Sequence, residues 1–99
     1  MEFYLTHSKN PKKKYSVLYI NKDDKLKTIN FGSSGYDDYI ITNNDKQKNR
    51  YKQRHKHDNI NDYTFAGFWS MHLLWNHKTI KQSIKNIERT YKIKIINLL

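Results

Sequence analysis

Hydrophobic and polar positions alternate in the first third of the chain in the manner of paired strands. Residues 15–20 (Tyr-Ser-Val-Leu-Tyr-Ile) are mostly β-branched or aromatic, and residues 25–31 alternate lysine with apolar residues in part. Between them, residues 21–24 (Asn-Lys-Asp-Asp) form a cluster typical of a turn. This pattern predicts a β-hairpin over residues 15–31.

Two shorter segments also have the character of strands. The break Gly32-Ser33-Ser34-Gly35 ends the hairpin, and residues 36–42 (Tyr-Asp-Asp-Tyr-Ile-Ile-Thr) are expected to form a short third strand. Near the C-terminus, residues 92–96 (Lys-Ile-Lys-Ile-Ile) alternate at a period of two. They can therefore return as a fourth strand beside the hairpin.

Helical periodicity dominates the second half of the chain. Residues 67–75 carry apolar side chains around the whole helical circumference, which predicts a short buried helix with Phe68, Trp69 and Trp75 in the core. Residues 79–91 form an amphipathic helix with capping-box spacing between Thr79 and Gln82. The apolar side of this second helix comprises Ile80, Ile84, Ile87 and Tyr91.

These elements predict one small α+β domain over residues 15–99. Its antiparallel sheet has about three strands, with a fourth if the C-terminal segment joins, and two or three helices cover it. Residues 1–14 are expected to be a flexible basic arm or an edge strand. Phe3 and Leu5 suit a strand, whereas the run Asn10-Pro11-Lys12-Lys13-Lys14 interrupts regular structure.

Charge adds a further predicted helix in the centre of the chain. Cations occupy every second position between residues 46 and 56: Lys46, Lys48, Arg50, Lys52, Arg54 and Lys56. Lysine, glutamine and arginine favour a helix, Asn43 or Asn44 can cap it, and Asp45 suits its first turn. On a helix the cations form two stripes, 46/50/54 and 48/52/56, with Tyr51 and His55 as a narrow inner seam.

Composition excludes several classes of protein. The chain has 99 residues and a net charge of +10. It has no cysteine, so disulfides and cysteine-based zinc sites are excluded. No apolar run approaches the ~18 residues of a membrane span, and the N-terminus lacks the features of a secretory signal. Lysine, asparagine, isoleucine and tyrosine make up 46 of the 99 residues, which suggests an AT-rich genome.

The basic central segment favours nucleic-acid binding. Closely spaced cations suit phosphate contacts, and Tyr51 between them suits stacking on a base. No residue pattern predicts base-specific recognition. The expected function is therefore non-enzymatic, largely sequence-independent binding of DNA, with RNA also compatible, through Lys46, Lys48, Arg50, Tyr51, Lys52, Arg54 and Lys56.

Catalytic and metal-binding patterns are weak. The chain has no Ser/His/Asp order, no phosphate-binding glycine loop and no cysteine nucleophile. His55, His57 and Asp58 could form a metal-dependent nuclease site, but their spacing matches no specific ligand motif. We therefore expect no catalytic residue, no cofactor and no metal.

Three segments together resemble a known family. They are Gly35-Tyr36-Asp37-Asp38-Tyr39, Arg50-Tyr51-x-x-Arg54-His55, and Ala66-Gly67-Phe68-Trp69-Ser70-x-x-Leu73-Leu74-Trp75-Asn76 with Ser83-Ile84. The chain resembles, over about residues 14–87, small basic proteins of unknown function encoded by giant nucleocytoplasmic large DNA viruses. It departs from the family pattern in lacking a proline after the Trp-Asn pair. The resemblance implies a viral origin and virion association, and it transfers no catalytic residue.

The resemblance also implies that these three segments form one constellation. In that hypothesis Asp37 or Asp38 caps or pairs with Arg50 or Arg54, and the tryptophans Trp69 and Trp75 hold the two helices together. The arginines would then be partly structural. The phosphate contacts would be Lys46, Lys48, Lys52 and Lys56.

An alternative function belongs to a different class. The chain could be a small virion structural protein, a minor capsid or cement component that docks on acidic virion proteins. Scattered cations together with exposed Phe3, Leu5, Leu98 and Leu99 would favour this docking, whereas a continuous cationic stripe would favour DNA. The apolar ends leave a homo-oligomer open. Either function places the protein in the virion or the infected host cell (cytoplasm or viral factory), neither secreted nor in a membrane.

Overall fold

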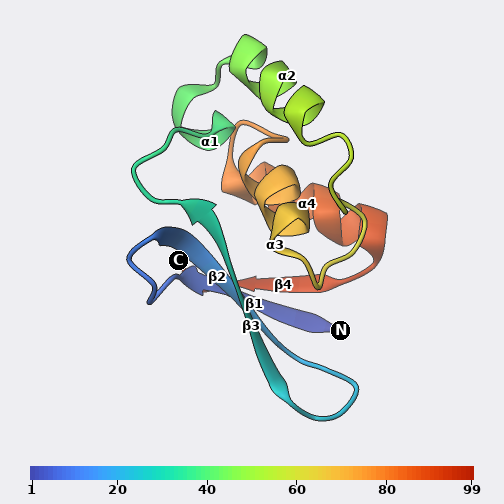
Figure 1. The fold of residues 1–99 in the computed structure, drawn as a ribbon. Coiled ribbons are helices and arrows are strands. Elements are labelled where there is room, and N and C mark those ends of the chain that lie inside the picture. The colour runs from blue at the N-terminus through green and yellow to red at the C-terminus, as the bar shows by residue number, and fades with distance from the viewer.

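A four-stranded mixed sheet with helices packed on one face forms the framework of the chain (Figure 1). The computed structural model describes residues 1–99. Its elements are β1 (Glu2–His7), β2 (Lys13–Ile20), β3 (Leu26–Ser33), α1 (Tyr39–Thr42), α2 (Asp45–Arg54), α3 (Ala66–Trp69), the π-helical turn η1 (Ser70–Leu74), α4 (Ile80–Tyr91) and β4 (Lys94–Asn97). The predicted α+β class and the hairpin over residues 15–31 are confirmed.

The N-terminal segment lies inside the sheet, whose strand order is β3-β2-β1-β4. β1 pairs antiparallel with β2 and parallel with β4, and its side chains Phe3 and Leu5 are fully buried. The expectation of a flexible arm or an edge strand is therefore wrong for residues 2–7. The period of two places Phe3 and Leu5 on the same face, towards the core, and pairing with β4 on the second edge makes β1 an interior strand.

The C-terminal strand joins the sheet, but on the far side of β1 from the hairpin. Phe3 faces Ile95 in a parallel register, so the sheet is mixed and not purely antiparallel. The Ile95 amide hydrogen faces away from β1 and donates to Glu88 Oε2 of α4 at 3.0 Å. The helix thus satisfies a donor at the edge of the sheet and fixes where β4 begins.

The expected third strand over residues 36–42 is a short helix in the structure. Asp38 caps α1, because its Oδ1 accepts from the Ile41 amide at 3.0 Å. The other carboxylate oxygen pairs with Lys14 Nζ at 2.7 Å, and the Asp38 side chain is only 2% exposed. Asn43 ends the helix in the left-handed conformation. Capping chemistry and a nearly buried ion pair therefore override the strand propensity of Tyr39-Ile40-Ile41.

The other predicted helices are confirmed. Asn44 caps α2 by accepting from the Gln47 amide at 3.0 Å, and Thr79 caps α4 by accepting from the Gln82 amide at 3.2 Å. The buried helix over residues 67–75 begins at Ala66 and widens into a π-helical turn in its second half, which the periodicity does not predict. None of these helices has both the length and the hydrophobicity needed to cross a bilayer.

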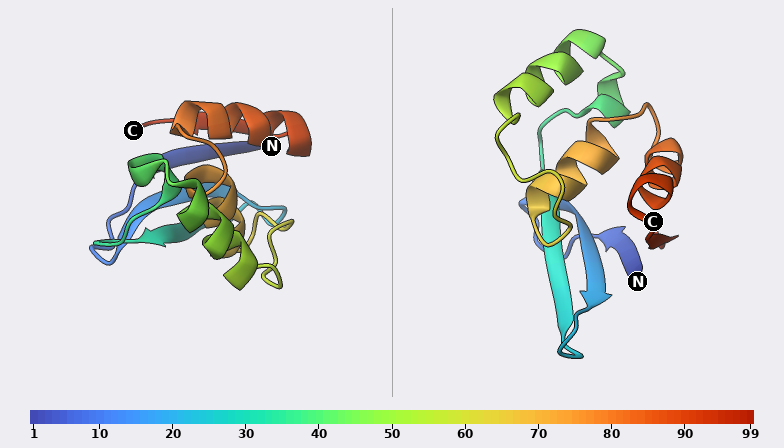
Figure 2. Two further views of the ribbon diagram at one scale, coloured as in Figure 1. Left: turned by 90° about the horizontal axis from the view of Figure 1, so that it is seen from above. Right: turned by 90° about the vertical axis from the view of Figure 1, so that its right-hand side faces the viewer.

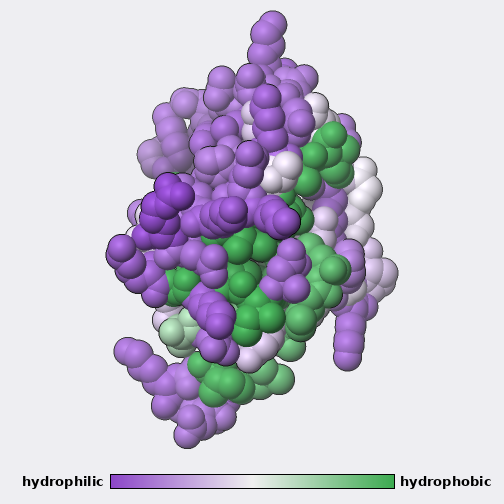
Figure 3. Space-filling model, turned by 180° about the vertical axis from the view of Figure 1, so that it is seen from behind, coloured by the Kyte–Doolittle hydropathy of each residue, from purple (hydrophilic) through white to green (hydrophobic).

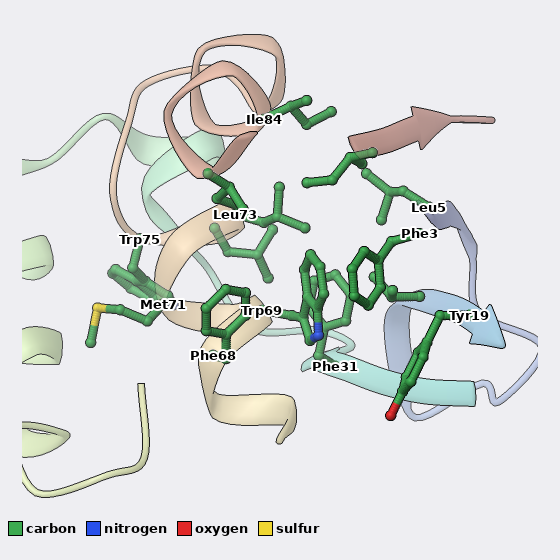
Figure 4. Close-up of a cluster of buried hydrophobic side chains, with 14 of the residues drawn as sticks. Phe3, Leu5, Tyr19, Phe31, Phe68, Trp69, Met71, Leu73, Trp75 and Ile84 are labelled. Atoms are coloured by element: carbon green, nitrogen blue, oxygen red, sulfur yellow. The ribbon is translucent and has the colours of Figure 1, made fainter. Parts of the chain in front are cut away.

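Aromatic side chains form the centre of the core, as predicted for Phe68, Trp69 and Trp75. The Trp69 ring centroid lies 5.2 Å from that of Phe3 and 6.5 Å from that of Phe31 on the sheet, and 4.9 Å from that of Phe68. Its indole Nε1 donates to the Tyr63 carbonyl at 2.8 Å. Trp69 therefore joins the sheet to α3 with its only polar atom satisfied (Figure 4).

The helices form two layers above the sheet. α3, η1 and α4 carry the buried residues that meet the strands, whereas α2 has no buried residue and lies farther from the sheet (Figures 1 and 2). The layering leaves one long side of α2 facing the solvent.

Gly32, near the end of β3, predicts a specific stability effect. It has φ +77°, and a Cβ built on it would lie 2.9 Å from Leu74 Cδ1. Gly67 has no positive φ, and a Cβ built on it would lie 4.0 Å from its nearest neighbour, Asp58 Cβ. Gly32→Ala should lower the free energy of unfolding by about 2 kcal/mol through backbone strain and overpacking, whereas Gly67→Ala should leave it unchanged or raise it slightly. Urea denaturation measures both, and equal losses in the two variants would contradict this account.

A half-buried histidine on η1 predicts a pH effect on stability. His72 Nε2 lies 2.7 Å from the Ile60 carbonyl and 3.2 Å from the Tyr91 hydroxyl. Burial lowers the pKa of His72 from its ordinary value of 6.5; the Ile60 carbonyl opposes this shift and the Lys52 charge adds to it. Below about pH 6.5 the unfolded state therefore binds the proton more readily than the folded state, so the free energy of unfolding falls as the pH drops towards the lowered value.

The measurement is urea denaturation between pH 5 and 7.5. His72→Gln should remove this contribution to the pH dependence, whereas His57→Gln, at an exposed position, should retain it. An unchanged slope in His72→Gln would show that another group is responsible.

Candidate nucleic-acid interface

Helix α2 is held to the rest of the molecule by an aromatic stack on its inner side. The Tyr51 ring lies parallel to that of Trp75, with 4.3 Å between centroids and 5° between planes. The His55 ring centroid is also 4.3 Å from that of Tyr51. The predicted inner seam of Tyr51 and His55 is confirmed, and burial raises the pKa of the Tyr51 phenol. Because its ring already has these partners, Tyr51 serves to anchor the helix rather than to present a free face to a base.

Two of the predicted contact lysines point towards the body of the protein. Lys48 Nζ donates to the Asn76 carbonyl at 2.6 Å and lies 4.7 Å from the Tyr39 ring centroid. Lys52 Nζ donates to Asn76 Oδ1 at 3.3 Å, and burial, with the charge of Lys48, lowers its pKa. These two lysines therefore tie α2 to the turn after η1.

The remaining cations of the segment face the solvent. Lys46, Arg50 and Arg54 are exposed at a spacing of four residues, and their side chains make no hydrogen bond or ion pair within the chain. Lys56 is also exposed, but it lies beyond the end of the helix at Arg54. The outward stripe is thus Lys46, Arg50 and Arg54, whereas Lys56 lies on the other side, where it lines a small pocket with Lys52 and Asn76.

This arrangement corrects the expected division of labour. The arginines were expected to be partly structural and the four lysines to contact phosphate, yet Lys48 and Lys52 are the residues hydrogen-bonded to the body of the protein. Arg50 has no such contact, and Arg54 lies only over the Tyr51 ring, 6.0 Å from its centroid. The partner of Asp38 is Lys14 on β2 and not an arginine of α2, and the same lysine also donates to the Tyr36 carbonyl at 2.5 Å.

The expected role of the tryptophans is confirmed for one of the two. Trp75 binds α2 to the end of η1 through its stack on Tyr51. Trp69 instead points to the sheet, where it contacts Phe3 and Phe31. The two helices are therefore held together by one tryptophan, and the other joins them to the strands.

A groove of about 740 Å³ separates the inner side of α2 from the sheet and the start of α3. All three segments of the sequence resemblance contribute to its walls: the loop at Gly35–Asp38, α2 from Gln47 to His55, and α3 with the beginning of η1. Arg54 belongs both to the groove and to the outward stripe. The sequence analysis did not assign Lys13, Tyr36 or Ser70 to a site, because they come to line one groove with Arg54 only in the folded chain.

Charge is distributed unevenly between pairs and free groups. One ion pair forms between a basic side chain and a carboxylate, Lys14–Asp38, and the His55 and Asp58 side chains are also in contact, with 2.5 Å between Nδ1 and Oδ2. Eighteen of the nineteen lysine and arginine side chains therefore have no carboxylate within 4 Å. The helical half of the molecule near α2 is strongly hydrophilic, whereas hydrophobic surface gathers lower on the face seen in Figure 3.

The possible nuclease site gains no geometric support. His55 and Asp58 are in contact, but no group of three or more His, Asp or Glu side chains lies close enough to hold a metal ion.

Comparison with known proteins gives one match. Residues 4–55, just over half the chain and extending from β1 to the end of α2, match the family described as "Family of unknown function (DUF5754)". No curated protein matches, and no solved structure matches. The matched region includes the hairpin, the Asp38 cap and the outward stripe of cations, and the chain belongs to the DUF5754 family of unknown function.

Proposed function

We propose that the protein binds nucleic acid, without catalysis, through the solvent-facing side of α2. The contact residues are Lys46, Arg50 and Arg54. One observation carries the proposal: these three cations are exposed, lie along one side of a single helix, and have no carboxylate partner within the chain. Like charges four residues apart on a helix repel one another, so an external polyanion would relieve a cost that the fold itself does not offset.

The spacing of the stripe suits a phosphate backbone. Lys46 and Arg54 are eight residues apart, which corresponds to about 12 Å along a helix. Successive phosphates of one strand of duplex DNA rise about 3.4 Å each, so the stripe spans three or four of them. The Tyr51–Trp75 stack and the Lys48 and Lys52 contacts hold the helix in place. Little ordering is then required when the stripe meets its ligand.

Phosphate contacts carry no sequence information, so we propose that the binding is largely independent of sequence and depends steeply on salt. We further propose that this binding takes place at a viral genome, in the virion or the infected cell, which the resemblance to small basic proteins of large DNA viruses supports. DNA is the proposed ligand, with RNA compatible with the same contacts.

A virion structural role remains the second candidate function. Phe3 and Leu5, which were expected to help form its docking surface, are in the core. Leu98 and Leu99 remain 57% and 42% exposed, and at the tip of the hairpin Ile20 and Leu26 are 51% and 62% exposed. These exposed apolar ends, surrounded by unpaired cations, are the observation that favours docking on an acidic protein.

The double substitution Lys46→Gln and Arg50→Gln tests the proposed contact surface. It should weaken binding of a 20-base-pair duplex about tenfold at physiological salt and reduce the slope of log K against log salt by about 2, because two phosphate contacts are lost. Fluorescence anisotropy over a salt series measures both quantities.

The matched control is Lys81→Gln with Lys85→Gln, which removes the same charge from two exposed positions on α4. The control should retain nearly the original slope. Equal losses of affinity and slope in the two double variants would mean that binding only follows net charge. That result would favour the virion structural role over nucleic-acid binding.

A further inference from the structure

The groove beside α2 is of a size that suits a nucleotide. Its volume of about 740 Å³ lies within the range of small-molecule sites. A base that stays stacked within a duplex cannot enter such a space, but an unstacked base of a single strand can. Arg54 links the groove to the outward stripe, so a strand that follows the stripe passes the mouth of the groove.

Tyr36 on the groove wall is suited to stacking. It is 73% exposed, the highest value among the aromatic side chains, and its ring has no aromatic partner in the chain. Its backbone is nevertheless fixed, because its carbonyl accepts from Lys14 Nζ at 2.5 Å. Gly35, at φ +81°, makes the turn that precedes it. An exposed aromatic ring on an anchored backbone is a stacking platform that loses little freedom when a base is bound.

The polar lining of the groove matches a nucleotide better than a simple anion. Lys14 is already paired with Asp38, and His55 and Asp58 are in contact with each other. The charged side chains of the lining that have neither contact are Lys13, Asp37 and Arg54. Neutral hydrogen-bonding groups also contribute: Ser33, Gln47 and Ser70. A base edge requires both donors and acceptors, whereas its phosphate requires a cation, and the lining supplies all three.

We propose that this groove binds one unstacked nucleotide of a single-stranded nucleic acid. Tyr36 stacks on the base, the polar side chains of the groove meet the base edge, and Arg54 contacts the adjoining phosphate. The inference rests on the proposed function and deepens it. The outward stripe alone would bind a single strand and a duplex alike, whereas the groove makes a single strand the preferred ligand.

The test compares a 12-nucleotide single strand with a duplex of the same length. Tyr36→Ala should weaken single-strand binding about tenfold and leave duplex binding unchanged. The slope of log K against log salt should stay the same, because no phosphate contact is lost. Tyr4→Ala is the matched control, since Tyr4 is also an exposed tyrosine, 39% exposed, but lies on β1 away from the groove; it should change neither affinity.

Two further variants separate stacking from other effects of Tyr36. Tyr36→Phe should retain single-strand affinity, whereas Tyr36→Ile, which keeps hydrophobic bulk without a ring, should lose it as the alanine variant does. Urea denaturation of each variant shows whether the fold is intact. If the alanine variant is unstable, the comparison of single-strand affinity between Tyr36→Ile and Tyr36→Phe decides the question.

The outcomes distinguish the groove from the stripe. If Tyr36→Ala changes both affinities equally, or neither, the groove proposal is overturned while duplex binding through the stripe stands. If single-strand binding depends on Tyr36 but is unaffected by Lys46→Gln with Arg50→Gln, the stripe is overturned and the groove stands. Absence of binding to both probes overturns both proposals.

Discussion

The nearly buried ion pair between Lys14 and Asp38 joins the strand-forming half of the chain to the helical half. One oxygen of Asp38 caps α1 and the other meets Lys14 on β2, with 2% of the side chain exposed. A buried carboxylate is costly to desolvate unless each oxygen has a partner, and here both have one. The same lysine holds the Tyr36 carbonyl. The course of the loop that leaves the sheet, the start of the helical region and one wall of the groove therefore depend on this contact.

Aromatic packing offsets the unfavourable charge of the chain. The net charge is +10, and Lys14 is the one lysine or arginine that pairs with a carboxylate. Repulsion among the remaining positive charges therefore opposes compaction of the chain. Trp69 binds the sheet to α3, and the Tyr51–Trp75 stack binds α2 to η1. These rings supply large buried areas from few residues, which is what a small domain with little aliphatic surface requires. The outward stripe of α2 can remain unpaired because the Tyr51–Trp75 stack and the hydrogen bonds of Lys48 and Lys52 hold the opposite side of the helix.

Much of the architecture is readable from local patterns. The hairpin, the caps of α2 and α4 and the burial of Phe68, Trp69 and Trp75 follow from period, capping residues and hydrophobicity. The candidate site is readable only in part. The alternation of cations from Lys46 to Lys56 predicts two stripes, but they are equivalent in sequence. The stripe that faces the solvent is decided by Asn76, which accepts from Lys48 and Lys52 and lies more than twenty residues away.

The sequence by itself determined the local elements and the positive charge, because periodicity, capping and composition act over a few residues. The tertiary structure alone decided the interior position of β1, the parallel pairing of β4, the replacement of an expected strand by α1, and the groove between three distant segments. Each of these depends on partners that the chain brings together only on folding: β4 beside β1, Lys14 beside Asp38, and Tyr36 and Arg54 on the walls of one groove. A residue pattern can show that a side chain needs a partner, but long-range packing decides which partner it meets.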